Sequence, residues 1–209
     1  MNLYSLKIKL HLLKKNIFPV RGRNLIAASK AKKYNVKYNI IGNDNDFDLG
    51  NSKLHDILIH VRGNHNKLKI ENNCYLKNTN LMFEGNNCEI FIGANTTIES
   101  AHIDVKENNM KISIAENCMF SDEIFISTSD SHSIINTEGK RINQAKSISV
   151  GKNVWLGKRV MVLKGSMIEE GAIIAAGSIV TGNISANSIY AGNPAKKIKE
   201  NIHWLRARI

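Results

Sequence analysis

The sequence contains no uninterrupted apolar run of the length needed to cross a lipid bilayer. Its basic N-terminus is the nearest candidate, but polar side chains interrupt the apolar residues there at Lys7, Lys9, His11, Lys14 and Lys15. Such a segment lacks the continuous apolar core of a secretory signal peptide. We therefore expect a cytoplasmic protein whose basic N-terminus could contact the inner face of the membrane.

Cysteine is scarce as well. The three cysteines, Cys74, Cys88 and Cys118, are an odd number and form no CxxC pair, the spacing typical of a zinc or redox site. Each follows an asparagine, which indicates a recurrent position in a repeat. We expect buried, reduced side chains that pack as small apolar residues, and a reactive thiol is the alternative.

Acidic residues are fewer than basic ones. The sequence has 18 Asp and Glu and 29 Lys and Arg, which gives a formal net charge of +11. A charge of this size attracts phosphates, acidic glycans or an anionic membrane surface over long range. The sequence has no motif of mixed basic and aromatic residues typical of nucleic-acid binding. We therefore expect an anionic partner that is not a nucleic acid.

What the sequence does contain is a six-residue repeat. Between residues 148 and 185, aliphatic residues recur at Val150, Leu156, Val162, Ile168, Ile174 and Val180. This period does not fit the stripe of an amphipathic helix. A short strand with one inward aliphatic residue, followed by a tight corner, explains it when three such sides close a triangular coil. The pattern therefore predicts a hexapeptide-repeat parallel β-helix.

The same step recurs earlier in longer coils, which begin at Ile70, Ile92 and Ile114. The extra residues fall at one corner of the triangle, and the longest insertion covers 127–147. It contains the polar run STSDSHSI with its single histidine. A loop of this length in a compact repeat is usually functional or disordered.

Stacked coils leave unsatisfied backbone groups at both ends, so terminal caps are expected. We predict a basic, helical N-terminal extension over 1–38, the β-helix over 39–190 and a helical C-terminal cap over 191–209. Pro194 suits the first turn of that last helix, and the apolar residues after it have helical spacing. The predicted fold is thus an all-β parallel β-helix with short helical extensions.

Three segments together resemble the hexapeptide-repeat acyltransferases: ISIAENCMFSDEIFISTSDSHSI, ISVGKNVWLGKRVMVLKGSMIEEGAIIAAGSIVTGNI and SIYAGNPAKKIK. The resemblance covers about 112–200. Within that family, the histidine loop followed by a coil tryptophan is most similar to the O-acetyltransferases of capsular polysaccharide and lipopolysaccharide. The resemblance implies a left-handed coil, a homotrimer and acetyl-CoA bound in a groove between neighbouring helices.

The resemblance also implies direct transfer of the acetyl group to a glycan hydroxyl within a ternary complex. His132 would be the general base, and a loop histidine without chemistry is the alternative. Asp130 would orient the imidazole or would only form a turn. Trp155 would line the pocket beside His132 or would pack on the helix surface.

Two groups of residues could bind acetyl-CoA. Small side chains would let the backbone approach the pantetheine arm, although they equally suit tight corners, at Gly157, Ala175, Ala176, Gly177 and Ser178. Lys196 and Lys197 would meet the phosphates, or would simply form a solvated basic face. No metal is expected, because His60, His65 and His102 lie in irregular early coils, without the flanking residues of the β-helical carbonic anhydrases.

The leading interpretation is therefore an acetyl-CoA-dependent O-acetyltransferase that acts on a bacterial surface glycan, and the net charge favours an acidic one. One alternative keeps the fold and changes the acceptor to an amino sugar, serine or a xenobiotic. Another is a structural or binding β-helix without catalysis. The sequence leaves the acceptor and the acetylated hydroxyl open.

Overall fold

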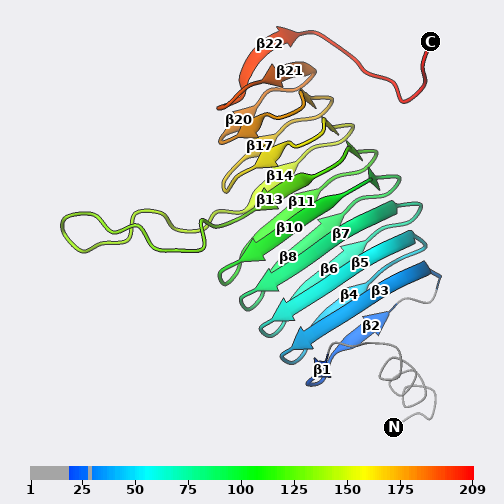
Figure 1. Cartoon of the computed structure of the whole chain (residues 1–209), viewed down its shortest axis with the longest axis vertical. Helices are drawn as coiled ribbons and strands as arrows, with labels where there is room; N and C mark the ends of the chain where they lie inside the picture. Colours follow the sequence, from blue (N-terminus) through cyan, green and yellow to red (C-terminus); the bar gives the residue numbers. More distant parts are fainter. Residues whose placement is uncertain (1–18, 28–29) are drawn as a thin grey trace.

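The aliphatic residues that recur every six positions lie in short strands and point into the interior. Each of them is the last residue of its strand and is at most 3% exposed. The computed structural model describes residues 19–27 and 30–209, which wind into an all-β parallel solenoid (Figure 1). The predicted parallel β-helix is confirmed.

Three faces make up the triangular coil, and we name them in the order in which the chain visits them. The first face is an eight-stranded parallel sheet composed of β2 (Leu25–Ala27), β4 (Asp46–Asp48), β6 (Lys67–Ile70), β8 (Glu89–Ile92), β11 (Lys111–Ile114), β14 (Ile148–Val150), β17 (Met167–Ile168) and β20 (Asn183–Ile184). The second face contains β9 (Thr97–Ile98), β12 (Met119–Phe120), β15 (Trp155–Leu156), β18 (Ile173–Ile174) and β21 (Ser188–Ala191).

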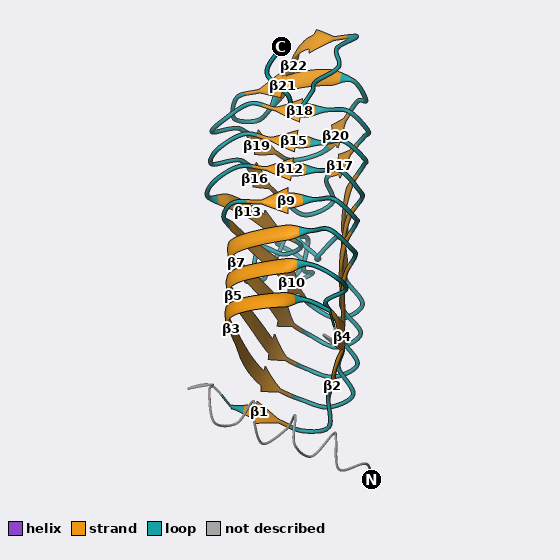
Figure 2. Ribbon diagram, turned by 90° about the vertical axis from the view of Figure 1, so that its right-hand side faces the viewer, coloured by secondary structure: helices purple, strands orange, loops and turns teal. Residues whose placement is uncertain are grey.

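The third face contains β10 (Ala101–Lys106), β13 (Ile124–Ser127), β16 (Met161–Val162) and β19 (Ile179–Val180). In the N-terminal coils, three long strands bend from the second face onto the third: β3 (Lys32–Ile41), β5 (Lys53–Arg62) and β7 (Tyr75–Glu84). β1 (Val20–Arg21) pairs with the end of β3. Figure 2 shows the second face as a vertical line of strands.

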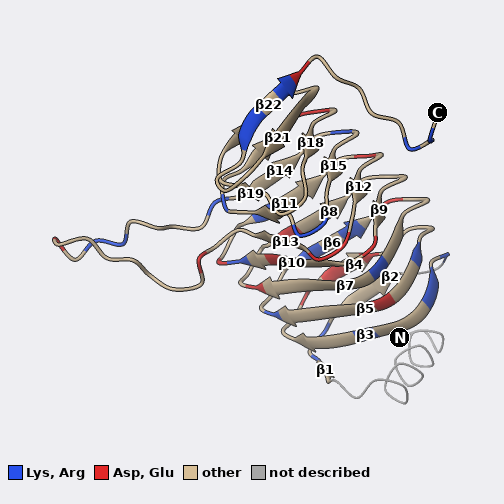
Figure 3. Ribbon diagram, turned by 45° about the horizontal axis from the view of Figure 1, so that its top comes forward, with Lys and Arg blue, Asp and Glu red and all other residues tan. Residues whose placement is uncertain are grey.

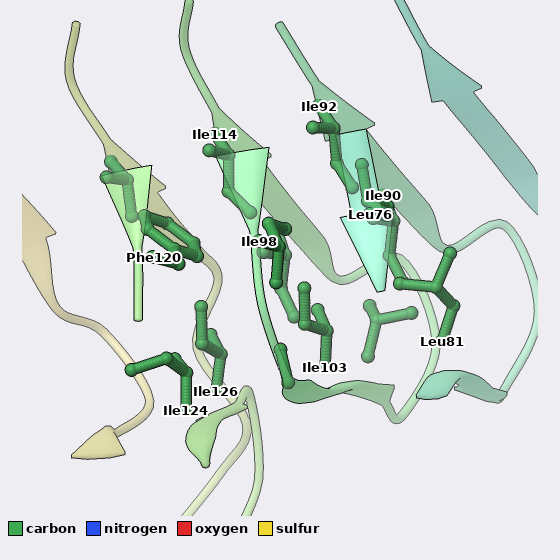
Figure 4. Close-up of a cluster of buried hydrophobic side chains, with 14 of the residues drawn as sticks. Leu76, Leu81, Ile90, Ile92, Ile98, Ile103, Ile114, Phe120, Ile124 and Ile126 are labelled. Atoms are coloured by element: carbon green, nitrogen blue, oxygen red, sulfur yellow. The ribbon is translucent and has the colours of Figure 1, made fainter. Parts of the chain in front are cut away.

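In-register stacking places identical or similar residues directly above one another in the core. Ile92 stacks on Ile114, Ile98 on Phe120, and Ile103 lies one coil from Ile126, as Figure 4 shows. All are at most 1% exposed. Burying one such side chain contributes about 1.5–3 kcal/mol relative to leaving it in water. The interior is therefore one continuous apolar column.

The three cysteines belong to this column. Cys74, Cys88 and Cys118 are free and buried, and each thiol donates to a backbone carbonyl of the next coil, for example Cys118 Sγ to Gly151 O at 3.2 Å. Burial raises the pKa of Cys118 to about 12. The prediction that they pack as small apolar residues is confirmed.

No helix is seen in the described part of either expected extension. Over 191–209 the chain instead forms β22 (Lys196–Glu200), which pairs antiparallel with β21 and is followed by an irregular tail. The unpaired backbone groups of the last coil favour this strand over a helix. At the other end, β1, β2 and β3 are strands, so the β-helix begins before residue 39, and residues 1–18 of the expected helical extension lie outside the described residues. Residues 19–27 and 30–209 contain no helix that could span a lipid bilayer.

Glycines form the corner between the third and first faces in the N-terminal coils. Gly42, Gly63 and Gly85 have φ of 144°, 143° and 157°, a region that favours glycine. A methyl group on Gly63 would lie 1.9 Å from the carbonyl oxygen of Gly85. Only glycine allows the coils to approach so closely at this corner.

We expect Gly63→Ala to destabilise the protein by about 2–4 kcal/mol, because the added methyl group both clashes with backbone and strains φ. The thermal unfolding midpoint measures this. Gly182→Ala is the matched control, since a methyl group on Gly182 would have no atom within 4 Å. Equal midpoints for the two variants would contradict the role of the corner.

Candidate active site

A loop interrupts the coils between β13 and β14. In Figure 1 it projects sideways from the solenoid, at the corner between the third and first faces. The loop is stiffened by an isolated antiparallel bridge between Ile135 and Arg141. The insertion predicted over 127–147 is therefore present, and it carries His132 at its start.

His132 is exposed on this loop. Its backbone N–H donates to the carbonyl of Asp130 at 2.8 Å, and its own carbonyl accepts from Asn143 Nδ2 at 2.7 Å. The imidazole forms no hydrogen bond with any described residue. The backbone of His132 is thus fixed, while its ring is available to a partner from outside the loop.

Among the described residues, the carboxylate of Asp130 forms no hydrogen bond with the imidazole of His132. It accepts from the ammonium of Lys164 and from Asn143 Nδ2 at 2.9 Å. Lys164, followed by Asn143, holds the pKa of Asp130 below its ordinary value. Asp130 therefore ties the loop to the β16–β17 corner, and the structure does not bring it together with the ring it was predicted to orient.

Asn143 is the hydrogen-bonding centre of the loop, and no sequence pattern indicated it. It is only 7% exposed, and its Oδ1 accepts from Ile134 N at 2.7 Å and from Arg141 Nε at 3.2 Å. Its Nδ2 donates to Asp130 and to the carbonyl of His132. One buried amide thus joins both sides of the loop around His132.

Glu107, just after β10, anchors the base of the loop. Its carboxylate forms two hydrogen bonds with Arg141, at 2.6 and 2.8 Å, and accepts from Ser129 Oγ at 2.7 Å. The guanidinium of Arg141, more than any other group, lowers the pKa of Glu107 to about 2. The coil that precedes the loop therefore holds it through a bidentate ion pair.

Trp155 lies on a different face from the loop. It points outward from β15 on the second face, in register with Met119 and Ile173, and is 36% exposed. Trp204 of the C-terminal tail packs on it, with ring centroids 5.9 Å apart. Within one chain the described residues form no contact between Trp155 and His132.

The C-terminal tail forms a cleft beside Trp155. Trp204 Nε1 donates to Asn153 O at 2.6 Å, and the guanidinium of Arg206 donates to Cys118 O at 2.8 Å and Thr97 Oγ1 at 2.9 Å. The cleft has a volume of about 540 Å³. Sequence patterns did not indicate it, because the tail returns to coils that lie far from it in the chain.

The small residues predicted to approach acetyl-CoA gather at the corner between the second and third faces. A methyl group on Gly157 would lie 2.7 Å from Ala176 N, which shows how closely these two coils stack. Ala176 and Gly177 are exposed and Ala175 is half-buried. Ser178 is fully buried, and its hydroxyl accepts from Gly192 N at 3.1 Å, so it faces the chain itself.

Lys196 and Lys197 are exposed on β22, opposite Ala191 and Tyr190 of β21. The Nζ of Lys197 lies 3.1 Å from Glu200, which raises the pKa of this lysine. The structure therefore places both lysines at the C-terminal end of the second face. In residues 19–27 and 30–209, no group of three or more His, Cys, Asp or Glu is arranged to hold a metal ion.

Residues 147–182 match the family described as bacterial transferase hexapeptide (six repeats). The match covers the compact C-terminal coils, in which the strands recur every six residues.

Two curated proteins are related to this chain in sequence. The chain is 36% identical over 140 residues to a polysialic acid O-acetyltransferase of Escherichia coli O1:K1 / APEC, which covers 66% of this chain and 45% of that protein. It is 32% identical over 108 residues to a polysialic acid O-acetyltransferase of Neisseria meningitidis, covering 41% and 50%. The chain thus spans about half the length of the curated relatives it matches.

Two solved structures resemble the whole solenoid. The polysialic acid O-acetyltransferase OatWY gives a TM-score of 0.83 at 28% identity and covers 93% of this chain and 92% of that one. The polysialic-acid-specific acetyltransferase NeuO gives 0.67 at 27% identity, covering 93% and 84%. The similarity therefore includes the N-terminal coils, which the family match leaves out.

We expect Glu107→Gln to loosen the loop, because the neutral amide cannot form the ion pair with Arg141. Faster tryptic cleavage after Lys140 and Arg141 would report this. Glu123→Gln is the matched control, since Glu123 pairs with Arg159 at 2.7 Å at another corner. Equal cleavage rates in the two variants would contradict the anchoring role.

The ion pair between Glu107 and Arg141 also makes the stability of the folded loop depend on pH. The pKa of Glu107 falls on folding from 4.5 to about 2, so the ion pair stabilises the folded loop fully above about pH 4.5 and weakens as the pH falls towards about 2. The wild-type loop should therefore lose amide protection over this range, whereas Glu107→Gln should show little further loss.

Proposed function

We propose that this protein is an acetyl-CoA-dependent O-acetyltransferase that acts on a hydroxyl group of a bacterial surface glycan. One observation carries the proposal: a solenoid similar along nearly its whole length to two polysialic acid O-acetyltransferases presents an exposed histidine on an anchored loop. The backbone of His132 is held while its ring is open to solvent, as a base that must meet an incoming hydroxyl requires.

His132 acts as the general base of the proposed reaction. Its imidazole takes the proton of the acceptor hydroxyl as the oxygen attacks the thioester carbon of acetyl-CoA. The same ring then returns a proton to the departing CoA thiolate. Lys164, Asp130 and Asn143 support the reaction indirectly, because they fix the backbone on which the ring is mounted.

The complete site is formed between subunits of a homotrimer. His132 lies on a loop that extends away from its own coils, and Trp155 lies on a different face of the same chain. In a closed ring of three copies, the loop of one protomer reaches the second face of its neighbour. His132 and a neighbouring Trp155 then line one pocket, where water is excluded and both substrates are oriented.

Acetyl-CoA occupies the groove beside the C-terminal coils of the second face. Gly157, Ala175 and Ala176 leave the corner backbone open to the amides of a pantetheine arm. Lys196 and Lys197, at the end of the same face, provide positive charge for the phosphates. Ser178 contributes to the corner only, because its hydroxyl is used within the chain.

The acceptor is an acidic glycan polymer. Both curated relatives carry polysialic acid in their names, and a net charge of +11 favours an anionic substrate. The reaction takes place in the cytoplasm, where acetyl-CoA is supplied and the three thiols stay reduced.

Replacing His132 with alanine should lower acceptor-dependent thiol release from acetyl-CoA by roughly 10²–10⁴-fold, the usual effect of losing a general base. The assay uses polysialic acid, an amino sugar and serine as acceptors. His65→Ala is the control, because His65 is an exposed histidine at a corner of an early coil. Unchanged release in His132→Ala would remove His132 from the chemistry, and preference for serine or the amino sugar would reject the glycan acceptor.

A further inference from the structure

The positive charge of this chain is concentrated at one end. The first 41 residues contain ten Lys and Arg and no Asp or Glu, whereas the rest of the chain contains nineteen Lys and Arg and eighteen Asp and Glu. The coils that carry the candidate active site are therefore nearly neutral. The N-terminal part of the chain holds almost the whole net charge of +11.

Two of the N-terminal cations form a pair on the second face. Lys32 of β3 and Lys53 of β5 are exposed and in register, and they line a cleft of about 520 Å³ with Tyr75. Basic positions on β3 and β5 are visible in Figure 3. The cleft is otherwise lined by polar groups of Asn51, Ser52 and Asn73 and by the buried Cys74.

Neither lysine is neutralised by the chain. No carboxylate lies within ion-pair distance of Lys32 or Lys53 in the described residues, and residues 1–18 and 28–29 contain no Asp or Glu that could pair with them. The lysines of the first face behave differently, since Lys69 pairs with Glu71 and Lys111 with Glu89. The unpaired charge on the second face is thus available to a ligand.

A single line of outward side chains connects this pair to Trp155. The register of successive strands gives the order Lys32, Lys53, Tyr75, Thr97, Met119 and Trp155. No carboxylate interrupts the line, and Figure 2 shows its strands stacked along the long axis. Adjacent strands lie about 4.8 Å apart, so the five steps span about 24 Å.

Arg206 places a third cation on this line. Its guanidinium contacts Thr97 Oγ1 and the carbonyl oxygens of Asn95, Asn117 and Cys118, all of which are neutral. The hydrogen bonds fix its position and leave its charge uncompensated. Positive charge therefore recurs between the N-terminal cleft and Trp155.

We propose that this line is a binding track for an extended anionic glycan, with Lys32 and Lys53 binding carboxylates of the polymer about 19–24 Å from Trp155. The inference rests on the proposed function, because it assigns the track to the acceptor. A repeating polyanion matches separated, fixed cations along one face. A membrane surface matches them less well, because most of the side chains that line the cleft around Lys32 and Lys53 are polar.

The test measures binding of sialic acid oligomers, without acetyl-CoA, to the full chain and to Lys32→Gln/Lys53→Gln. For an oligomer long enough to span the track, we expect the Kd to rise about tenfold in the variant and the difference to shrink at high salt. A sialic acid dimer, which cannot span the track, should show a smaller difference between the two proteins. Lys67→Gln/Lys69→Gln is the matched control, since it removes the same charge from the first face.

An equal loss of oligomer affinity in Lys32→Gln/Lys53→Gln and in Lys67→Gln/Lys69→Gln would overturn the track, because net charge alone would then explain binding. So would an unchanged oligomer Kd accompanied by weaker binding to phosphatidylserine vesicles, which would assign the lysines to a membrane. A protein that binds oligomers through Lys32 and Lys53 but acetylates none would reject the proposed function and keep the track. An enzyme that acetylates the oligomers, but binds them equally well without Lys32 and Lys53, would reject the track and keep the proposed function.

Discussion

Hydrogen bonds between successive coils are the constraint on which the rest of this structure depends. A coil cannot satisfy its own backbone N–H and C=O groups, so each must be matched by the coil above and the coil below. This requirement fixes the parallel register, which places residues at the same position of successive coils directly above one another. The aliphatic column, the cysteines within it and the glycine corner of Gly42, Gly63 and Gly85 all follow from that stacking.

The corners are less constrained than the faces, because a loop can leave the solenoid there without interrupting a strand, although some corner backbone groups also pair between coils, such as Asn117 N with Ala94 O. An insertion at a corner therefore costs the core nothing, and the loop after β13 makes use of this freedom. The loop has no core of its own. Polar contacts from Glu107, Asn143 and Lys164 supply the rigidity that apolar packing supplies elsewhere, and His132 depends on them for its position.

Parallel stacking also brings residues from different coils together along one face of the solenoid. Side chains that are about twenty residues apart in the sequence become neighbours along a face, and charges at one end of the solenoid share a line with a tryptophan near the other. A polymer is the natural ligand of such a surface, since it can contact several coils at once. In the proposed enzyme, the coils both build the site and guide the acceptor towards it.

The sequence by itself determined the β-helix, the burial of the cysteines and the position of the histidine loop, because each depends on a short repeat or on an interruption of it. It did not determine the C-terminal strand, since the spacing of Ile198, Ile202 and Leu205 suits a helix and only the open edge of β21 favours β22. It likewise could not show that Asp130 binds Lys164, or that Asn143 and Glu107 hold the loop. These contacts join residues from different coils, and only the tertiary structure decides which coils meet.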